Sequence, residues 1–397
     1  MRRSMHKVHE LVVVAAVVLA VGLLLASPSP ASAQELSSVP DEGTVQTNGR
    51  VDSILVVGNR VYLGGTFTTV NGVPRSRLAA IDASTGELTD WAPRASTVVR
   101  ALAASPDGSR IYVGGDFRSV NGVTGLSYLA AIDASTGAPD ASWKPQADSV
   151  VRALATLGDR VYIGGDFLTV NEQGGQHLAA VDGVSGTLDS DWYPVANGTV
   201  RTLLPSSDGK SVYAGGDFTA INGRTRPYLA LLNSAVGNVR SWQPLIDPNG
   251  RVWDLEKSGG RLYSAEGGEP GGAIAAYDTI TGARLWRHWT AGDVQAVTVL
   301  GNKLYIGGHF TSVGGEYGRL DGRIPRDAFA AFDAASGELD HEWVPTQVRE
   351  TKSEGQVWAM ESDASRGRVY AGGEFTAISG AAHQGFAQFS EQGGTLP

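Results

Sequence analysis

The sequence predicts an all-β fold, and within that class a seven-bladed β-propeller made of four-stranded antiparallel blades. Two observations carry this prediction: a motif that returns seven times at a spacing of about fifty residues, and short β-rich runs separated by turn residues inside each copy. No segment has the length and periodicity of a useful helix. Units of this size cannot bury both faces alone, so we expect them to pack side by side in a closed ring.

The first 33 residues are expected to be a secretory signal peptide. Three basic residues precede an apolar run from Leu11 to Ala26, and Ala31 to Ala33 matches an A-x-A cleavage site. The run has 16 residues, fewer than the ~20 that span a bilayer comfortably, although an uncleaved anchor is the alternative. We therefore expect a mature chain that begins at Gln34, has no membrane span, and is secreted or held at the cell surface.

Composition narrows the classes of function. The chain has 397 residues, of which 42% are hydrophobic and 18% charged, and it has no cysteine. Stability should therefore come from packing and not from disulfides. The formal charge is −9, and loss of three basic residues and one acidic residue with the leader brings it to −11. Such a chain is not expected to bind nucleic acid.

The repeat is marked by a tyrosine followed by a glycine doublet, as in Tyr62 to Gly65. The seven tyrosines stand at positions 62, 112, 162, 213, 263, 305 and 370, at spacings of 50, 50, 51, 50, 42 and 65. The first four spacings define the unit, and the last two reveal altered copies. Residues 34–397 are therefore expected to form a single propeller domain.

Each unit is expected to be a four-stranded meander. In the second copy the β-rich runs are Val99 to Leu102, Arg110 to Phe117 and Tyr128 to Asp133, and Trp143 marks the fourth. Asp133 to Gly137 forms a turn, because Asp can accept backbone N–H groups and Gly can adopt positive φ.

The two ends of the chain are expected to close the ring. The last copy stops after Phe389 without its fourth strand, while Val39 precedes Val51 much as Val344 precedes Val357. The N-terminal segment can therefore supply the missing strand of the last blade, and this pairing would remove two exposed edges.

The repeated glycines and tryptophans are expected to serve packing. A glycine doublet inside a strand suggests close approach of a neighbouring blade, with approach of a ligand as the alternative. A tryptophan can fill the space between adjacent sheets, and exposed rings would instead suggest a surface that binds sugars. The tryptophans in question are Trp91, Trp143, Trp192, Trp242 and Trp343, with Trp286 or Trp289 in the fifth copy.

One repeated pair has charge. Arginine opens the innermost strand in three copies, and the same copies carry aspartate after the glycine doublet: Arg100, Arg152 and Arg201 with Asp116, Asp166 and Asp217. These residues can face each other across an antiparallel pair and form three ion pairs. The alternative is an arc of arginines at the channel mouth that holds a carboxylate or sulfate.

The irregular copies are where the sequence places a candidate site. From Phe310 to Phe329 the chain is 19 residues long, against 11 from Phe67 to Leu78, while the fifth copy is shortened. A long loop beside a gap predicts a cleft at blades 5 to 7. The residues expected around it are Trp253, Gln295, His309, Trp358 and Glu374, with Asp52 and His383.

The chemistry of that site is left open. Glu374, His309 and Asp52 are candidates for acid/base catalysis, but no catalytic residue is assigned. No metal-ligand spacing, nucleophile elbow or phosphate loop occurs, so neither a metal nor another cofactor is expected.

The motifs resemble known repeat families. The phrases from Gly64 to Gly72 and from Leu78 to Gly86 resemble the delta-60 repeat of bacterial secreted propellers and the G-G-x-F repeats of fungal cell-surface polarity proteins. The glycine doublet and later tryptophan also look like Kelch units. Ala275 to Gly282, with Trp286, is similar to the tryptophan-docking motif of quinoprotein dehydrogenases, although their vicinal cysteines are missing here. The resemblance implies a propeller at the cell surface and supplies no catalytic residues.

Three functions follow as alternatives. The first is a noncatalytic recognition or scaffold module, expected to be monomeric, whose top face binds a protein or a cell-envelope glycan. The second is a secreted carbohydrate-active hydrolase or lyase. The third is a purely structural surface module. An inward-facing cluster of His309 and Glu374 would favour the enzyme, and an exposed aromatic or apolar patch would favour recognition.

Overall fold

The computed structural model describes residues 35–246, 250–269, 271–316, 319, 321–348 and 356–395. All regular structure in these residues is β-strand and turn, as the sequence predicts. We find no helix in this part of the chain that has the length and apolar character needed to cross a membrane. The expected leader and Gln34 lie outside the described residues.

Each copy of the repeat folds into three antiparallel strands, an inner, a middle and an outer one. In the first copy, β2 (Val51–Val57) pairs with β3 (Arg60–Gly65), and β3 pairs with β6 (Leu78–Asp82). The other sets, in the order inner, middle, outer, are β7 (Val99–Ala104), β8 (Arg110–Gly115), β11 (Leu129–Asp133); β12 (Val151–Leu157), β13 (Arg160–Gly165), β16 (Leu178–Asp182); β17 (Val200–Pro205), β18 (Ser211–Gly216), β21 (Leu229–Asn233); β22 (Gly250–Ser258), β23 (Arg261–Gly268), β24 (Ala273–Asp278); β25 (Arg284–Leu300), β26 (Lys303–Gly314), β28 (Phe329–Asp333); and β30 (Val357–Asp363), β31 (Arg368–Gly373), β34 (Phe386–Phe389).

Short hairpins connect the middle and outer strands. In the first copy β4 (Thr69–Val70) pairs with β5 (Val73–Pro74), and the turn residues Asn71 and Gly72 both have positive φ, as a two-residue hairpin requires. The related pairs are β9 (Ser119–Val120) with β10 (Val123–Thr124), β14 (Thr169–Val170) with β15 (Gln173–Gly174), β19 (Ala220–Ile221) with β20 (Arg224–Thr225), β26 with β27 (Arg323–Pro325), and β32 (Ala377–Ile378) with β33 (Ala381–Ala382). On its other side, β32 pairs with β29 (Gln347–Val348).

Among the described residues a continuous fourth strand occurs only in the fifth copy, where the first part of β25 pairs with β24. In the first four copies and in the sixth, the fourth position is reduced to an isolated bridge, such as Ile81 with Leu88. The copies also differ in the sequence that comes next. In five copies a proline stands two residues after the tryptophan, as Pro93 follows Trp91, and proline cannot donate to a ladder. No proline follows Trp286 or Trp289, so β25 continues unbroken into the sixth copy.

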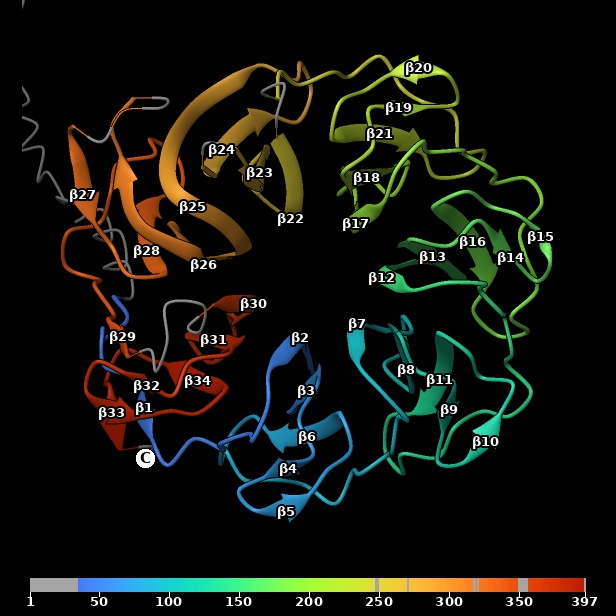
Figure 1. The fold of residues 1–397 in the computed structure, drawn as a ribbon, viewed down its shortest axis with the longest axis horizontal. Helices are drawn as coiled ribbons and strands as arrows, with labels where there is room; N and C mark the ends of the chain where they lie inside the picture. Colours follow the sequence, from blue (N-terminus) through green and yellow to red (C-terminus); the bar gives the residue numbers. More distant parts are fainter. Residues whose placement is uncertain are drawn as a thin grey trace, which may run out of the picture. The chain divides into compact units, whose positions relative to one another are not determined.

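The inner strands lie next to one another in a ring. Contacts run from β2 through β7, β12, β17, β22 and β25 to β30, and from β30 back to β2 (Figure 1). The glycine doublets permit this approach, because a Cβ on Gly64 would lie 2.7 Å from Val99 Cγ1 of the next copy. The interpretation of these glycines as packing positions is therefore confirmed.

The recurring tryptophans are buried between neighbouring copies, which confirms their expected packing role. Trp91 is 2% exposed, and its ring lies edge-on to Tyr62 with centroids 4.9 Å apart. Its Nε1 donates to the carbonyl of Asp133 in the next copy at 3.0 Å. In the fifth copy it is Trp286 that lies beside the repeat tyrosine, Tyr263. A large apolar ring with one satisfied polar atom suits this inter-sheet position.

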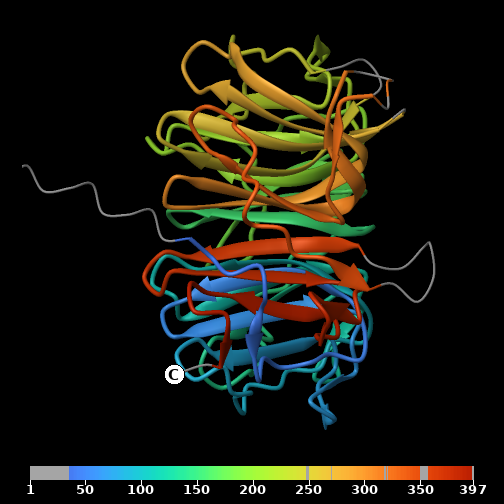
Figure 2. The ribbon, with the colours of Figure 1, turned by 90° about the vertical axis from the view of Figure 1, so that its left-hand side faces the viewer.

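The N-terminal segment lies against the last copy, but not as a full antiparallel strand. Instead β1 (Asp41–Glu42) pairs in parallel with β35 (Gly394–Thr395), and Ser37 N donates to the Ser390 carbonyl at 2.8 Å (Figure 2). The Asp41 carboxylate, 1% exposed, accepts from Gln388 Nε2 and Ser390 Oγ, both at 2.6 Å. The N-terminal segment thus lies beside the last copy, as predicted, but side-chain hydrogen bonds hold it there more than backbone strand pairing does.

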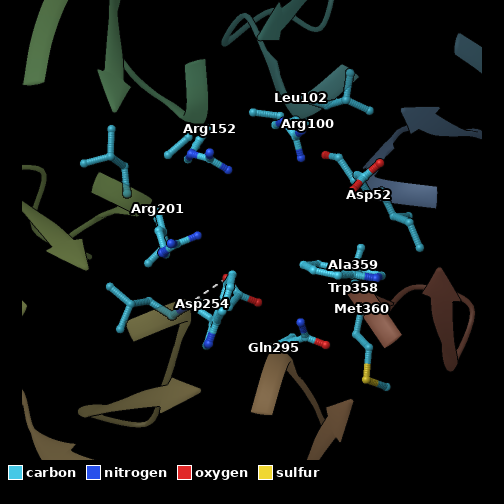
Figure 3. A pocket seen from close by; sticks show the side chains of 18 of the residues that line it. Asp52, Arg100, Leu102, Arg152, Arg201, Asp254, Gln295, Trp358, Ala359 and Met360 are labelled. Carbon is cyan, nitrogen blue, oxygen red and sulfur yellow. Dashed lines mark hydrogen bonds between the residues drawn. The ribbon is translucent and has the colours of Figure 1, made fainter. Parts of the chain in front are cut away.

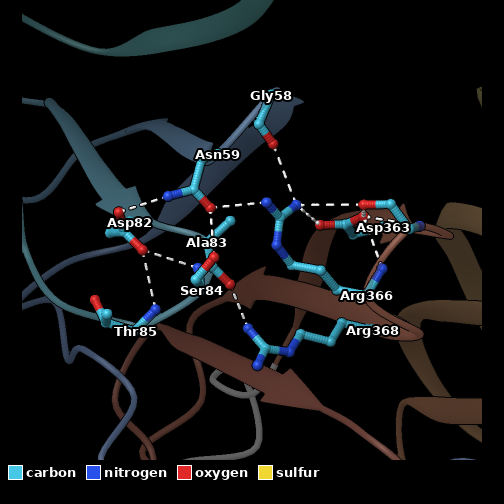
Figure 4. A network of polar contacts seen from close by, with 10 residues as sticks. Gly58, Asn59, Asp82, Ala83, Ser84, Thr85, Asp363, Arg366 and Arg368 are labelled. Carbon is cyan, nitrogen blue, oxygen red and sulfur yellow. Dashed lines mark hydrogen bonds and ion pairs between the residues drawn. The ribbon is translucent and has the colours of Figure 1, made fainter.

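Two arginines of the last copy also bind the first copy (Figure 4). Arg366 donates to the carbonyl of Gly58 at 3.1 Å and to Asn59 Oδ1 at 2.7 Å, and its ion pair with Asp363 fixes the guanidinium. Arg368 donates to the carbonyl of Ala83. Residues more than 280 positions apart are thereby joined.

Candidate functional site

A cavity of about 400 Å³ lies among the seven inner strands, and every residue that lines it belongs to one of them (Figure 3). Its volume is at the small end of the ~300–1,000 Å³ that is usual for ligand pockets. The cavity is therefore a product of the whole ring and not of any single copy.

Each inner strand carries a β-bulge at the same point, and the bulge sets the first ring of side chains in the cavity. In β7, for example, Val99 pairs with Gly115 and Ala101 with Gly114, which leaves Arg100 as the extra residue. A bulge redirects one side chain without altering the rest of the ladder. We call the seven extra residues the bulge ring: Asp52, Arg100, Arg152, Arg201, Trp253, Gln295 and Trp358.

Three adjacent strands contribute arginines to the bulge ring. Arg100 binds Asp116 through Nε at 2.9 Å and Nη2 at 2.8 Å, and Arg152 binds Asp166 at 2.8 and 2.7 Å in the same way. The third pair, Arg201 with Asp217, has distances of 2.8 and 2.6 Å. The three predicted ion pairs are thus confirmed. The aspartates do not line the cavity, whereas the arginines do.

The next position in the ring has the opposite arrangement. Asp52 lines the cavity, and Arg50 lies behind it, with Nε 2.7 Å from Asp52 Oδ1 and Nη1 2.9 Å from Glu374 Oε1. Burial raises the pKa of Asp52 to about 6, although the charges of Arg50 and Arg100 oppose the shift. The Asp52 side chain is 6% exposed, and its Oδ2 has no hydrogen-bond partner among the described residues.

The remaining side of the bulge ring is aromatic and amide in character. Trp253 and Trp358 meet edge to face with centroids 6.0 Å apart, and the Arg201 guanidinium lies 4.2 Å from the Trp253 ring centre. Gln295 comes from the strand between them in the ring and is 6% exposed. Its Nε2 donates to Gln356 Oε1 at 3.4 Å, while its own Oε1 is buried without a partner in the described part of the chain.

Three carboxyl groups line the cavity beyond the bulge ring. Burial raises the pKa of Asp254 to about 7, although backbone N–H groups of Val297 and Leu255 donate to it. Burial, followed by the charges of Glu256 and Asp254, raises the pKa of Glu361 to about 8, and burial also raises the pKa of Glu256. At neutral pH this part of the cavity therefore retains protons that exposed carboxyls would lose.

Sequence reasoning missed these carboxyls, as it missed Arg50. The signal was available from the repeat alignment. At the position of Asp254 the other copies carry Ser, Ala or Thr, and at the position of Glu256 and Glu361 they carry Leu, Ala or Thr. A charged residue among small or apolar equivalents indicates a local departure from the packing role.

The structure brings most of the proposed site residues together. Trp253, Gln295, Trp358, the three arginines and Asp52 all line the cavity. His309 and Glu374 do not. His309 is exposed on β26 opposite Asp293, and Glu374 is held behind the wall by Arg50. His383 lies elsewhere, 3% exposed, with Nδ1 3.1 Å from Thr44 Oγ1, because it follows the peripheral strand β33.

The cavity is lined by the inner strands of all seven copies, and the long connections of the irregular copies contribute no described residue to its lining. In the shortened fifth copy, β25 runs on as a single strand of 17 residues, and its first part adds a fourth strand beside β24. The long connection of the sixth copy extends β26 and pairs it with β27. In the described residues no three His, Cys, Asp or Glu side chains are grouped so as to hold a metal ion.

Comparison with known proteins agrees with a repeat of the propeller kind. Residues 206–239 match the model of a family described as a domain of unknown function (DUF5122) beta-propeller. No curated protein matches the chain. The crystal structure of the computationally designed Ika8 protein superimposes with a TM-score of 0.51 at 16% sequence identity, covering 90% of this chain and 100% of that one. At this identity the likeness concerns the fold alone. Together with the ring of sheets, these matches support a β-propeller.

Proposed function

We propose that this protein is a noncatalytic recognition module, a seven-bladed β-propeller that binds its ligand at the bulge ring. The observation that carries the proposal is a pair of buried acceptor atoms without partners, Asp52 Oδ2 and Gln295 Oε1, on residues that line one cavity. A buried acceptor without a donor costs roughly 1–3 kcal/mol, and a bound ligand would remove that cost.

The wider setting of the proposal comes from the sequence. The leader at residues 1–33 supports export, after which residues 34–397 would act in the medium or at the cell surface as a monomer. The G-G-x-F repeats support membership of the delta-60 type of secreted propeller. A protein or a cell-envelope glycan is the partner expected in that location, and aromatic rings beside polar groups suit either.

The three candidates for catalysis, Asp52, His309 and Glu374, support an enzyme less strongly than the cavity supports a recognition module. Asp52 lines the cavity, but His309 is exposed outside its wall and Glu374 is paired with Arg50. A general acid or base must come within hydrogen-bond reach of the reacting atom, and only one of the three faces the cavity.

The proposal is tested by binding. The purified protein is applied to a glycan array and to solubilised cell envelope, and the same is done with the double variant Trp253→Ala/Trp358→Ala. Tyr193→Ala is the matched control, because Tyr193 is 45% exposed and does not line the cavity. We expect binding to be lost in the double variant and kept in the control. Binding that survives the double substitution would show that the bulge ring is not the site.

Export is tested separately. The protein produced in a bacterial host is recovered from the medium, and its intact mass is measured. We expect the mass of residues 34–397. Recovery of the uncut chain only in the membrane fraction would contradict export and support an anchor.

A further inference from the structure

We propose that the bulge ring binds an acidic sugar, with the ligand carboxylate at Arg100, Arg152 and Arg201 and its hydroxyls at Asp52 and Gln295. This inference rests on the proposed function, and it names the chemical class of the ligand. Three features of the ring carry it: the direction of the ion pairs, the free acceptors, and the aromatic wall.

The three ion pairs form an array that presents its positive ends to the cavity. In each pair the guanidinium lines the cavity, and the aspartate lies outside the lining. In every case the aspartate uses the Nε–H and one N–H of Nη2, so both N–H groups of Nη1 and the second N–H of Nη2 are not used by it. Figure 3 shows the three guanidinium groups directed toward the open centre from neighbouring strands. Adjacent guanidinium donors suit the two oxygens of a carboxylate.

Within the described part of the chain, the rest of the ring holds unpartnered acceptors on Asp52 and Gln295 and unpartnered donors on Nε1 of Trp253 and Trp358, so a ligand with hydroxyl groups, which both donate and accept, suits it. Asp52 Oδ2 and Gln295 Oε1 are both buried acceptors without a partner among the described residues. Asp52 is next to Arg100 in the ring, and Gln295 stands between the two tryptophans. A simple anion such as sulfate has no donor to offer these atoms. A sugar acid offers both chemistries, because it combines a carboxylate with several hydroxyl groups.

The aromatic wall and the size of the cavity agree with this class. Trp253 and Trp358 contribute to the same lining as the acceptors, so the apolar face of a pyranose would meet indole surface. A cavity of about 400 Å³ suits a small ligand, or the terminal residue of a glycan, better than a folded partner.

A matched pair of ligands isolates the carboxylate. Methyl β-D-glucuronide and methyl β-D-glucoside differ only in the group at C6, and their binding to the purified protein is measured by calorimetry. We expect the glucuronide to bind at least about tenfold more tightly, since an ion-assisted contact is gained. Arg152→Gln should remove the difference between the two ligands.

Two further variants separate the parts of the site. Arg160→Gln is the control for Arg152→Gln, because Arg160 pairs with Asp189 at 2.6 Å in the same copy and does not line the cavity. Arg160→Gln should leave both affinities unchanged. Gln295→Met removes the acceptor at similar size, and it should weaken both glycosides equally. Thermal unfolding of each variant checks that the fold is intact.

Each result supports or overturns the proposal. Equal binding of the two glycosides, or no binding of either up to about 10 mM, overturns the acidic-sugar class. Recognition at the bulge ring survives that result if glycan-array binding still depends on Trp253 and Trp358, and fails if it does not. Binding of N-acetylglycine as tight as that of the glucuronide would overturn the sugar in favour of a peptide carboxyl terminus.

Discussion

A Cβ on Gly372 would lie 2.6 Å from Cγ1 of Val51, so the last repeat and the first repeat are in direct contact. The same relationship joins Gly64 to Val99 in neighbouring copies, at 2.7 Å. The contact between the two ends of the repeat array is thus of the same kind as a contact inside it. The junction of the ring therefore uses the same glycine–valine packing as the other copies, and the hydrogen bonds of Arg366 and Arg368 to the first copy are added to it.

Replacing Gly372 with alanine should therefore destabilise the protein. The added methyl group would overpack against Val51, at an expected cost of about 1–3 kcal/mol in the free energy of unfolding measured with urea. Gly175→Ala is the control, because a Cβ there meets no atom closer than 3.4 Å and should change stability by less than about 0.5 kcal/mol. Equal effects of the two substitutions would contradict the close contact at the junction.

The N-terminal segment should contribute to stability through Asp41. Asp41→Ala leaves the Gln388 amide and the Ser390 hydroxyl without their acceptor, so we expect a loss of about 1–3 kcal/mol. Glu42→Ala, at the exposed neighbouring position, should have little effect in the same urea titration. A deletion of residues 34–45 that unfolds no more readily than the intact chain would show that the segment does not close the ring.

The two kinds of tryptophan should respond differently to truncation. Trp192 is fully buried, and its Nε1 donates to Asn233 O at 3.0 Å, so Trp192→Ala should cost about 3–5 kcal/mol of stability. Trp358 lies half-buried at the cavity, and Trp358→Ala should cost only about 1 kcal/mol while abolishing ligand binding. Urea unfolding and a binding assay on both variants separate the packing role from the binding role. A larger loss of stability in Trp358→Ala than in Trp192→Ala would contradict this assignment.

Stability should fall as the pH rises from about 5 to 8. Burial raises the pKa of Asp254 to about 7 and that of Glu361 to about 8, so the folded state holds protons that the unfolded state has lost across this range. Unfolding then releases protons, and a higher pH favours it. Glu361→Gln should flatten the dependence and raise stability at pH 8.

The control for this titration is Asp107→Asn. Hydrogen bonds from Ser105 and Ser109 lower the pKa of Asp107 to about 2, so it titrates outside the range. The substitution should leave the slope of stability against pH unchanged. Stability that is constant from about pH 5 to 8 in the parent protein would show that the pKa values of the three cavity carboxyls are not raised as described.

The sequence predicted the all-β character and the place of each strand well, because the repeat compares seven versions of one unit. Its pairing of Arg100, Arg152 and Arg201 with their aspartates came from antiparallel strand pairing, and the ion pairs form although each arginine is the extra residue of a bulge. The reduction of the fourth strand was harder to predict from the sequence. The residues before each tryptophan resemble a strand in sequence, and only the structure shows that they form a single bridge to the outer strand.

The position of the candidate site was harder to predict for a different reason. Loop lengths pointed to the irregular fifth and sixth copies, but β25 absorbs that irregularity by becoming one long strand. Side chains such as Asp52 and Arg152 line one cavity only after the ring is closed. The position of His309 directly after the glycine doublet does not decide whether its side chain lines the cavity, and in the structure His309 is exposed and is not among the lining residues.

The bulges separate two roles within each inner strand: the paired residues hold the sheet together, and the extra residue faces the cavity. The residue skipped by each ladder can be exchanged with little consequence for register, because no backbone pair depends on it. Four chemistries already occupy this position in one chain: guanidinium, indole, carboxylate and amide. The bulge ring consequently consists of seven variable side chains on a constant backbone. New binding specificities can arise there, or be engineered, by one substitution at a time.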